Sequence, residues 1–231
     1  MNNRLLHYLS DFSALFFPKI CAGCGHVLVS QEKYICTSCL YHLPITNFHL
    51  DSNNQVARQL WGKFPFEHAA AMFLLRRKSR VERILYQIKY ANQPRLAYFL
   101  GKQYGDILAK SHVFTDVDVV IPIPLHKKKL KKRGYNQSFF LAKGIGMGLS
   151  KPVLEYGLVR KEDNVSQTKK SRLERYDNVL DVFMCPDQDR LQGKHVLLVD
   201  DVLTTGATLT AAAEQLIAAG CILSVLTLAR A

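Results

Sequence analysis

Two adjacent carboxylates, Asp200 and Asp201, follow an apolar run and precede a loop that is rich in hydroxyl groups. From residue 196 the chain reads Val-Leu-Leu-Val-Asp-Asp-Val-Leu-Thr-Thr-Gly-Ala-Thr. The four apolar residues predict a buried strand, and the Ala-rich stretch after the loop predicts a helix. The loop would gather backbone N–H groups, three hydroxyls and a helix N-terminus around one point, an arrangement that binds phosphate.

Together these residue types predict a binding site for a sugar phosphate. Asp200 and Asp201 can accept hydrogen bonds from two vicinal ribose hydroxyls while the loop takes the 5-phosphate. The predicted loop residues are Thr204, Thr205, Gly206, Ala207 and Thr208. In the structural alternative the acids end a strand and a Thr caps the helix. The presence of both acids and of the whole Thr-Thr-Gly-x-Thr pattern makes that alternative the weaker interpretation.

A run of six cations in seven positions follows Pro122-Ile-Pro124-Leu-His126. Its members are Lys127, Lys128, Lys129, Lys131, Lys132 and Arg133. Because like charges repel, a folded protein keeps such a run on a loop that faces solvent or an anion. At the carboxyl end of a strand, this loop would face the same cleft as Asp200.

Four of the six cysteines form two Cys-x-x-Cys pairs separated by eleven residues. These are Cys21 with Cys24, and Cys36 with Cys39. The spacing predicts a tetrahedral thiolate site for structural Zn²⁺, and the disulfide alternative is weak in a reduced cytoplasm. A module of about forty residues has too small a core to fold alone, so the metal would supply folding energy.

Strands and helices alternate along the rest of the chain, which predicts an α/β fold with a parallel sheet flanked by helices. Strands are expected at residues 69–75, 117–123, 153–159, 195–199 and 222–228. Helices are expected at residues 81–88, 95–109, 136–149 and 208–219. Ligands of such sheets bind at the carboxyl ends of the strands, where Asp200 and the cations lie.

Composition and polar stretches divide the 231 residues into three parts. An amphipathic helix is expected at 1–17, with Leu5, Leu9, Phe12 and Phe16 on one face. A small zinc module with four cysteine ligands at 18–45 and a polar linker at 46–54 precede a domain at 60–231. With 48% hydrophobic and 22% charged residues, the chain is typical of a soluble globular protein.

The formal net charge of +12 attracts polyanions such as nucleic acid, phosphates or anionic membrane. No stretch reaches the roughly 18 apolar residues that a membrane span requires. Polar residues interrupt the first 17 positions, which argues against a signal peptide. A cytoplasmic protein without a membrane span is therefore expected.

The order of these pieces resembles the ComF family of competence-associated proteins, also called the GntX family. The shared marks are the Cys-rich module, the Pro-x-Pro strand end, Arg133-Gly-Tyr-Asn-Gln137 and a later Gln167 with Arg175 and Asn178. The segment 196–208 closely resembles the phosphoribosyl pyrophosphate (PRPP) signature of type I phosphoribosyltransferases. The resemblance extends from Cys21 to nearly the end of the chain.

The resemblance implies a type I phosphoribosyltransferase-like fold that binds PRPP with Mg²⁺. It places Asp200 and Asp201 on the ribose hydroxyls and residues 204–208 on the 5-phosphate. The pyrophosphate would contact Lys132, Arg133 and Gly134. A mobile flap at 165–178 would neutralise the leaving group through Lys169, Lys170, Arg172 and Arg175. Neither an acceptor nor a general base is identified, so phosphoribosyltransferase activity stays open.

The family also implies a role in natural competence, with DNA uptake and transformation. Single-stranded DNA binding is expected, with phosphates held by the cation run and by Arg76, Arg77, Lys78 and Arg80. Tyr135 and Phe139 could stack on bases, although core packing is the stronger interpretation for Phe139. The alternative is a non-catalytic zinc-containing nucleic-acid-binding or partner-docking protein that retains a PRPP-like site. Its helix at 1–17 would dock on a DNA-processing protein of the competence system.

Overall fold

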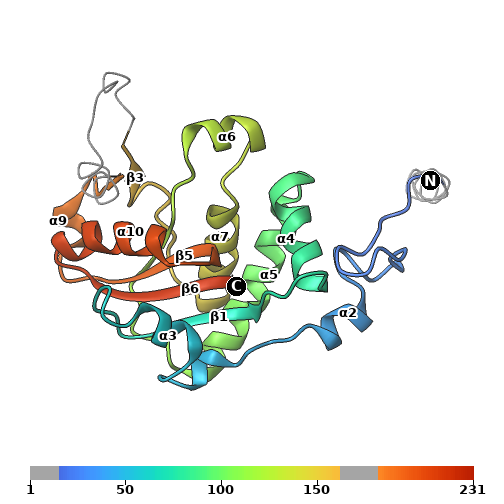
Figure 1. Ribbon diagram of the computed structural model, residues 1–231, viewed down its shortest axis with the longest axis horizontal. Coiled ribbons are helices and arrows are strands. Elements are labelled where there is room, and N and C mark those ends of the chain that lie inside the picture. Colours follow the sequence, from blue (N-terminus) through green and yellow to red (C-terminus); the bar gives the residue numbers. More distant parts are fainter. Residues whose placement is uncertain (1–15, 162–181) are drawn as a thin grey trace, which may run out of the picture.

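A computed structural model describes residues 16–161 and 182–231, and its centre is a four-stranded parallel sheet (Figure 1). The strand order is β1-β6-β5-β2, with β1 at Ala69–Leu74, β6 at Ile222–Arg230, β5 at His195–Leu203 and β2 at Val119–Pro122. Val199 of β5 pairs with Leu226 of β6 and with Pro122 of β2. The predicted α/β fold with a parallel sheet is confirmed.

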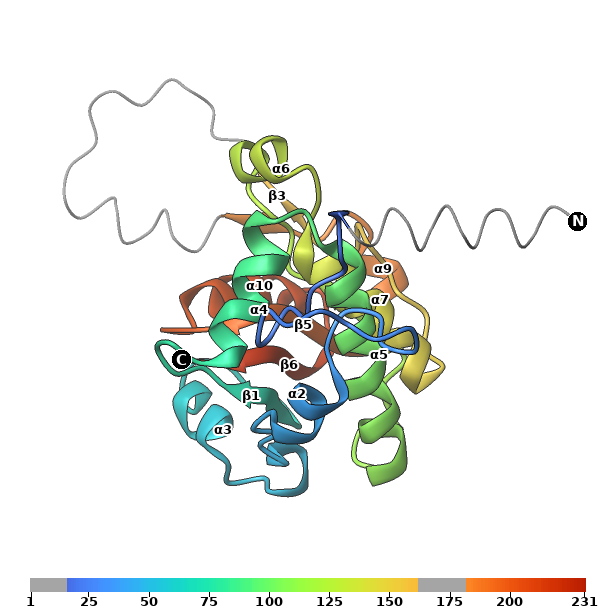
Figure 2. The same cartoon turned by 90° about the vertical axis from the view of Figure 1, so that its right-hand side faces the viewer.

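Helices cover both faces of this sheet (Figures 1 and 2). One face carries α4 (Arg80–Tyr90), α5 (Pro94–Ser111) and α7 (Gln137–Leu149), and the other carries α3 (Gln55–Leu60) and α10 (Ala207–Ala218). Successive residues of a strand point to opposite faces. Accordingly, Leu197 and Val199 belong to the first core, and Val196 and Leu198 belong to the second.

Helices α5 and α7 approach each other closely through glycines. A Cβ atom at Gly105 would lie 2.6 Å from the Ile145 carbonyl oxygen, and one at Gly148 would lie 2.6 Å from the Asp106 nitrogen. Gly144 and Gly148 lie inside α7 and permit this backbone contact with α5. This contact fixes α7, whose first turn reaches β5.

Shorter elements complete the described chain. They are α2 (Thr37–His42), the 3-10 helix η1 (Phe48–Leu50), α6 (Lys127–Arg133), α9 (Gln188–Leu191), and the antiparallel pair β3 (Val159–Arg160) and β4 (Phe183–Met184). None of the helices in the described ranges combines the length and the apolar character that crossing a bilayer requires.

Three local predictions were wrong. In place of the strand expected at 153–159, Val153 forms an isolated bridge with Val120, and only Val159 enters a strand, the two-residue β3. The cation run forms helix α6, because the His126 side chain accepts a hydrogen bond from the Lys128 N–H and Gly134 ends the helix at φ 82°. The stretch 46–54, interpreted as a linker, packs on β1, where Asn54 Nδ2 donates to the Ala69 carbonyl at 2.7 Å.

Candidate functional site

Asp200 and Asp201 lie within β5, which runs past the predicted end at Val199 because its pairing with β6 continues to Leu203. The Asp201 side chain is buried and Asp200 is half-buried. Both acids lie at the carboxyl-end edge of the sheet. The strand therefore holds two carboxylates at the edge where parallel sheets bind ligands.

Each carboxylate is tied to a different helix. Asp200 Oδ1 accepts hydrogen bonds from Ser138 Oγ at 3.0 Å and from the Asp201 N–H at 2.8 Å. Asp201 Oδ2 forms an ion pair with Lys89 Nζ at 3.1 Å. Among the described residues, this oxygen atom accepts no hydrogen bond of good geometry. The acids are thus held from α7 and from α4.

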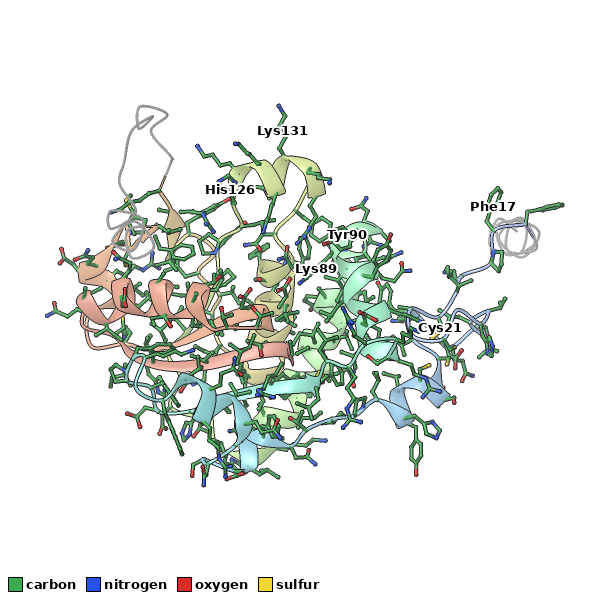
Figure 3. All side chains as sticks on the ribbon, in the orientation of Figure 1. Phe17, Cys21, Lys89, Tyr90, His126 and Lys131 are labelled. Atoms are coloured by element: carbon green, nitrogen blue, oxygen red, sulfur yellow. The ribbon has the colours of Figure 1, made fainter. Side chains whose placement is uncertain are left out.

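Lys89 lies in the last turn of α4. Its side chain is only 24% exposed because it turns toward Asp201. Figure 3 shows Lys89 between α4 and the end of the sheet, with Tyr90 at the upper end of α4. No local pattern links α4 to β5, so the pairing could not be found without the fold.

The environment of Asp200 favours its neutral form. Burial is the main cause and the negative charge of Asp201 is the second, and together they raise the pKa of Asp200 to about 7. The hydrogen bonds from Asp201 and Ser138, together with Lys89, act in the opposite direction. Asp200 can therefore change protonation state near neutral pH.

The loop after β5 has the form of an anion site. Gly206 adopts φ 86° and stands at the N-cap of α10, where it offers no side-chain cap. Thr205 Oγ1 accepts a weak hydrogen bond from the Ala207 N–H at 3.4 Å. Four of the five loop residues are exposed: Thr204, Thr205, Ala207 and Thr208. The first-turn N–H groups of α10 can consequently receive an anion.

Helix α3 and the turn that follows it support this loop from outside, a feature that the sequence did not indicate. Gln59 Nε2 donates to the Thr204 carbonyl, and Lys63 Nζ donates to the Thr205 carbonyl at 2.6 Å. Arg230 at the end of β6 holds Gln59 in turn, with Nε 2.9 Å from Gln59 Oε1. The carbonyl oxygens of Thr204 and Thr205 thus have hydrogen-bond donors on this side of the loop. The backbone N–H groups of the loop can then point toward the cleft.

A cleft of about 910 Å³ lies between α4, α6 and the ends of β2 and β5. Lys132 and Arg133 line it together with Asp200 and Asp201, whereas Gly134 ends α6 outside the lining. Arg133 donates to Gln137 Oε1 and lies over the Tyr90 ring. In Figure 3, Lys131 points away from the rest of the molecule. The structure thus brings two of the three predicted pyrophosphate residues to the acids.

The predicted flap residues Lys169, Lys170, Arg172 and Arg175 lie outside the described residues. So does the helix at 1–17 except for its last two positions, where Phe16 is 64% exposed. Arg160, which closely precedes the flap in sequence, lines the cleft.

The four cysteines of the N-terminal pairs converge, and their Sγ atoms all lie within 4.8 Å of one another. The Cys24 and Cys36 Sγ atoms are 3.7 Å apart, against about 3.8 Å for a tetrahedron with the Zn–S bond length. The Cys36 N–H donates to Cys21 Sγ at 3.2 Å. Within the described ranges no histidine joins this group, which could hold a metal such as zinc.

The thiols of this cluster differ in acidity. Burial raises the pKa of Cys21, but backbone hydrogen bonds, with that from Cys36 the strongest, lower it to about 6. Burial is also the main cause that raises the pKa of Cys39. Backbone N–H groups thus stabilise the thiolate form of Cys21, which is the form that binds a metal cation.

Comparisons with known proteins agree with the motifs. Residues 137–230 match the model of the phosphoribosyl transferase domain. Competence protein ComFC of Bacillus subtilis (strain 168) is 33% identical over 102 residues, 44% of this chain and 39% of that protein. Competence protein F of Haemophilus influenzae is 31% identical over 101 residues, 43% of this chain and 44% of that protein. DNA utilization protein YhgH of Escherichia coli O157:H7 is 25% identical over 207 residues, 87% of this chain and 85% of that protein.

The chain spans less than half the length of the two competence proteins and most of the length of YhgH. The matched domain runs from α7 to β6 and so contains Asp200, Asp201 and the loop 204–208. These matches confirm the resemblance that the sequence motifs predicted.

Proposed function

We propose that this chain, a ComF-family phosphoribosyltransferase-like protein, binds PRPP with Mg²⁺ in the cleft beside β5 and acts in natural competence in the cytoplasm. The observation that carries the proposal is the pair of acids beside a glycine loop at the N-terminus of α10. Both features lie inside the matched phosphoribosyl transferase domain. The names of the relatives support competence as the process.

In this proposal each part of the cleft binds one part of PRPP. Asp200 and Asp201 accept hydrogen bonds from the ribose hydroxyls, and residues 204–208 donate N–H and O–H groups to the 5-phosphate. Lys132 and Arg133, with the backbone at Gly134, contact the pyrophosphate. The flap cations Lys169, Lys170, Arg172 and Arg175 neutralise its charge.

The cleft also suits Mg²⁺, because carboxylate and phosphate oxygens are the ligands that this ion prefers. When bound, the ion would neutralise charge on the pyrophosphate. The Lys89 ammonium group forms an ion pair with Asp201. In this scheme a ribose hydroxyl replaces Lys89 at the Asp201 carboxylate. PRPP binding therefore frees Lys89 to contact an anionic ligand.

Titration calorimetry with PRPP and Mg²⁺ tests the site directly. The wild-type chain should bind, and D200A/D201A should bind at least about ten-fold more weakly because it loses hydrogen bonds to charged acceptors. D189A is the matched control, since Asp189 is an exposed acid on α9 away from the cleft. Absence of binding by the wild-type chain, or equal affinity in D200A/D201A, would falsify the proposal.

We also propose that Cys21, Cys24, Cys36 and Cys39 hold a structural Zn²⁺ in the N-terminal module at 18–45. The support is the convergence of four sulfur atoms at a spacing that fits tetrahedral thiolate coordination. In this scheme the module, the helix at 1–17 and the domain at 60–231 form three functional parts.

Single-stranded DNA binding is proposed alongside PRPP binding. The net charge of +12 and the exposed cations of α6 favour it, as do Arg76, Arg77, Lys78 and Arg80 near the N-terminus of α4. Affinity for an oligonucleotide should fall steeply with salt concentration, because phosphate contacts release counterions. A flat salt response contradicts this part. The exposed Phe16 and the rest of the helix at 1–17 would dock on a DNA-processing partner.

A further inference from the structure

Two tyrosines at the mouth of the cleft are exposed on α4. Tyr86 is 59% exposed and Tyr90 is 66% exposed. One helical turn separates them, their ring centroids are 5.2 Å apart and their planes are inclined by 44°. Both rings line the cleft that contains Asp200 and Asp201. They therefore present aromatic surface to whatever the cleft binds.

Core packing does not explain these rings. Helix α4 buries Val81, Ile84, Leu85 and Ile88, which lie on its other face. Stacking on bases was expected instead from Tyr135 or Phe139, and for Tyr135 this was wrong. Its ring is buried and its hydroxyl donates to the carbonyl of residue 88. The accessible aromatic pair is on α4.

Positive charge surrounds the pair on two sides. The Arg133 guanidinium lies 5.7 Å from the centroid of the Tyr90 ring, and Lys129 and Lys132 of α6 line the same cleft. Exposed lysines of α6 continue beyond the cleft at Lys128 and Lys131. At the other end of α4 the turn 76–78 adds three more cations. This charge extends further than one pyrophosphate needs and complements a chain of phosphates.

We infer that Tyr86 and Tyr90 form a stacking platform for the bases of single-stranded nucleic acid, whose phosphates lie against α6. The aromatic rings take the planar bases, and the cations on either side take the backbone. A free nucleobase would use the rings but leave the flanking charges without a counterpart. This inference rests on the single-strand binding proposed above and assigns the residues that contact the bases.

Fluorescence anisotropy with a labelled oligothymidylate and an abasic strand of equal length tests the platform. We expect Y86A/Y90A to bind the oligothymidylate roughly ten-fold or more weakly than the wild-type chain. Y86F/Y90F should bind like the wild-type chain, since stacking needs the ring and not the hydroxyl. Y41A is the matched control, because Tyr41 is 85% exposed but lies on α2 beside the cysteine cluster.

The abasic strand separates stacking from charge. The wild-type chain should bind it about as weakly as Y86A/Y90A binds oligothymidylate, with the same salt dependence. Equal affinity of the wild-type chain for both strands, or equal losses in Y86A/Y90A and Y41A, overturns the platform while single-strand binding stands. If the wild-type chain binds neither strand, the proposed single-strand binding fails as well. PRPP titration of the wild-type chain tests the proposed PRPP site separately from the platform.

Discussion

At the scale of single residues, Asp200 shows how the fold changes the acidity of a carboxyl group. Its pKa rises from 3.8 to about 7 because burial and Asp201 both oppose a second negative charge. Accepting two ribose hydroxyls would satisfy the carboxylates with new donors. Binding of the proposed sugar would therefore add hydrogen bonds that the two carboxylates lack in the protein alone.

The raised pKa predicts a specific dependence of stability on pH. The folded chain holds the Asp200 proton more tightly than the unfolded chain does. The free energy of unfolding therefore falls as pH rises between 3.8 and about 7, and the loss is complete above that range. D200N removes this loss. Its melting temperature should exceed the wild-type value by about 2 °C or more at pH 8 and match it near pH 4. Thermal unfolding of both proteins across pH measures the difference, and a constant difference contradicts the assignment.

The acids and the loop of the candidate site could be predicted from the sequence, but the residues that support them could not. Asp200, Asp201 and the loop at 204–208 are contiguous, so strand, acids and glycine turn appear in order along the chain. Lys89, Gln59 and their partners are joined only by the packing of α4 and α3 against the sheet. No periodicity or spacing connects them, which is why they were missed.

At the scale of elements, α3 and the turn after it support the loop 204–208, and this can be tested. Q59A/K63A frees the carbonyls of Thr204 and Thr205. The loop should then lose its fixed orientation, and the affinity for PRPP should fall several-fold, by an amount on the order of one hydrogen bond. R58A is the control, because the Arg58 side chain donates to Asn53 and not to the loop. Similar PRPP affinities for Q59A/K63A and R58A would argue against a role for α3.

Predictions of helices and strands succeeded where the apolar pattern was long. They failed where helix capping or strand pairing determined the secondary structure. The central strands follow from continuous apolar runs, and the helices α5, α7 and α10 follow from apolar residues that recur along each helix. The α6 cations were expected in a loop because they repel one another, yet His126 and Gly134 cap them into a helix. The apolar residues at 153–159 formed no full strand, since Val153 makes a single bridge with β2 and Val159 pairs with β4 instead.

At the scale of the whole molecule, the cysteine cluster is continuous with the main core. Cys21 and Cys39 are buried in the same apolar cluster as the residues of α4 and α5. The Arg83 guanidinium donates to the Gly23 carbonyl at 3.5 Å. The sequence predicted the metal site from its spacing but could not show that it packs on the sheet domain. Stability of the whole chain should therefore depend on the metal.

Loss of zinc is predicted to destabilise the chain as one unit. The purified protein should contain about one Zn²⁺ per chain, and C39S should lose the metal and melt roughly 5 °C lower. C221A is the control, because Cys221 is buried in the core on the other face of the sheet. Elemental analysis and calorimetry provide both readings. Full zinc content in C39S, or unchanged melting after chelation, contradicts a structural metal.

The central claim, that this cleft holds a phosphorylated pentose, is tested most directly by a crystal structure of the wild-type chain with PRPP and Mg²⁺. We predict the 5-phosphate in the loop 204–208 and the ribose hydroxyls within hydrogen-bond distance of Asp200 and Asp201, with Lys89 released from Asp201. Ligand bound elsewhere, or an empty cleft with the Lys89–Asp201 pair intact at saturating PRPP, would contradict the account.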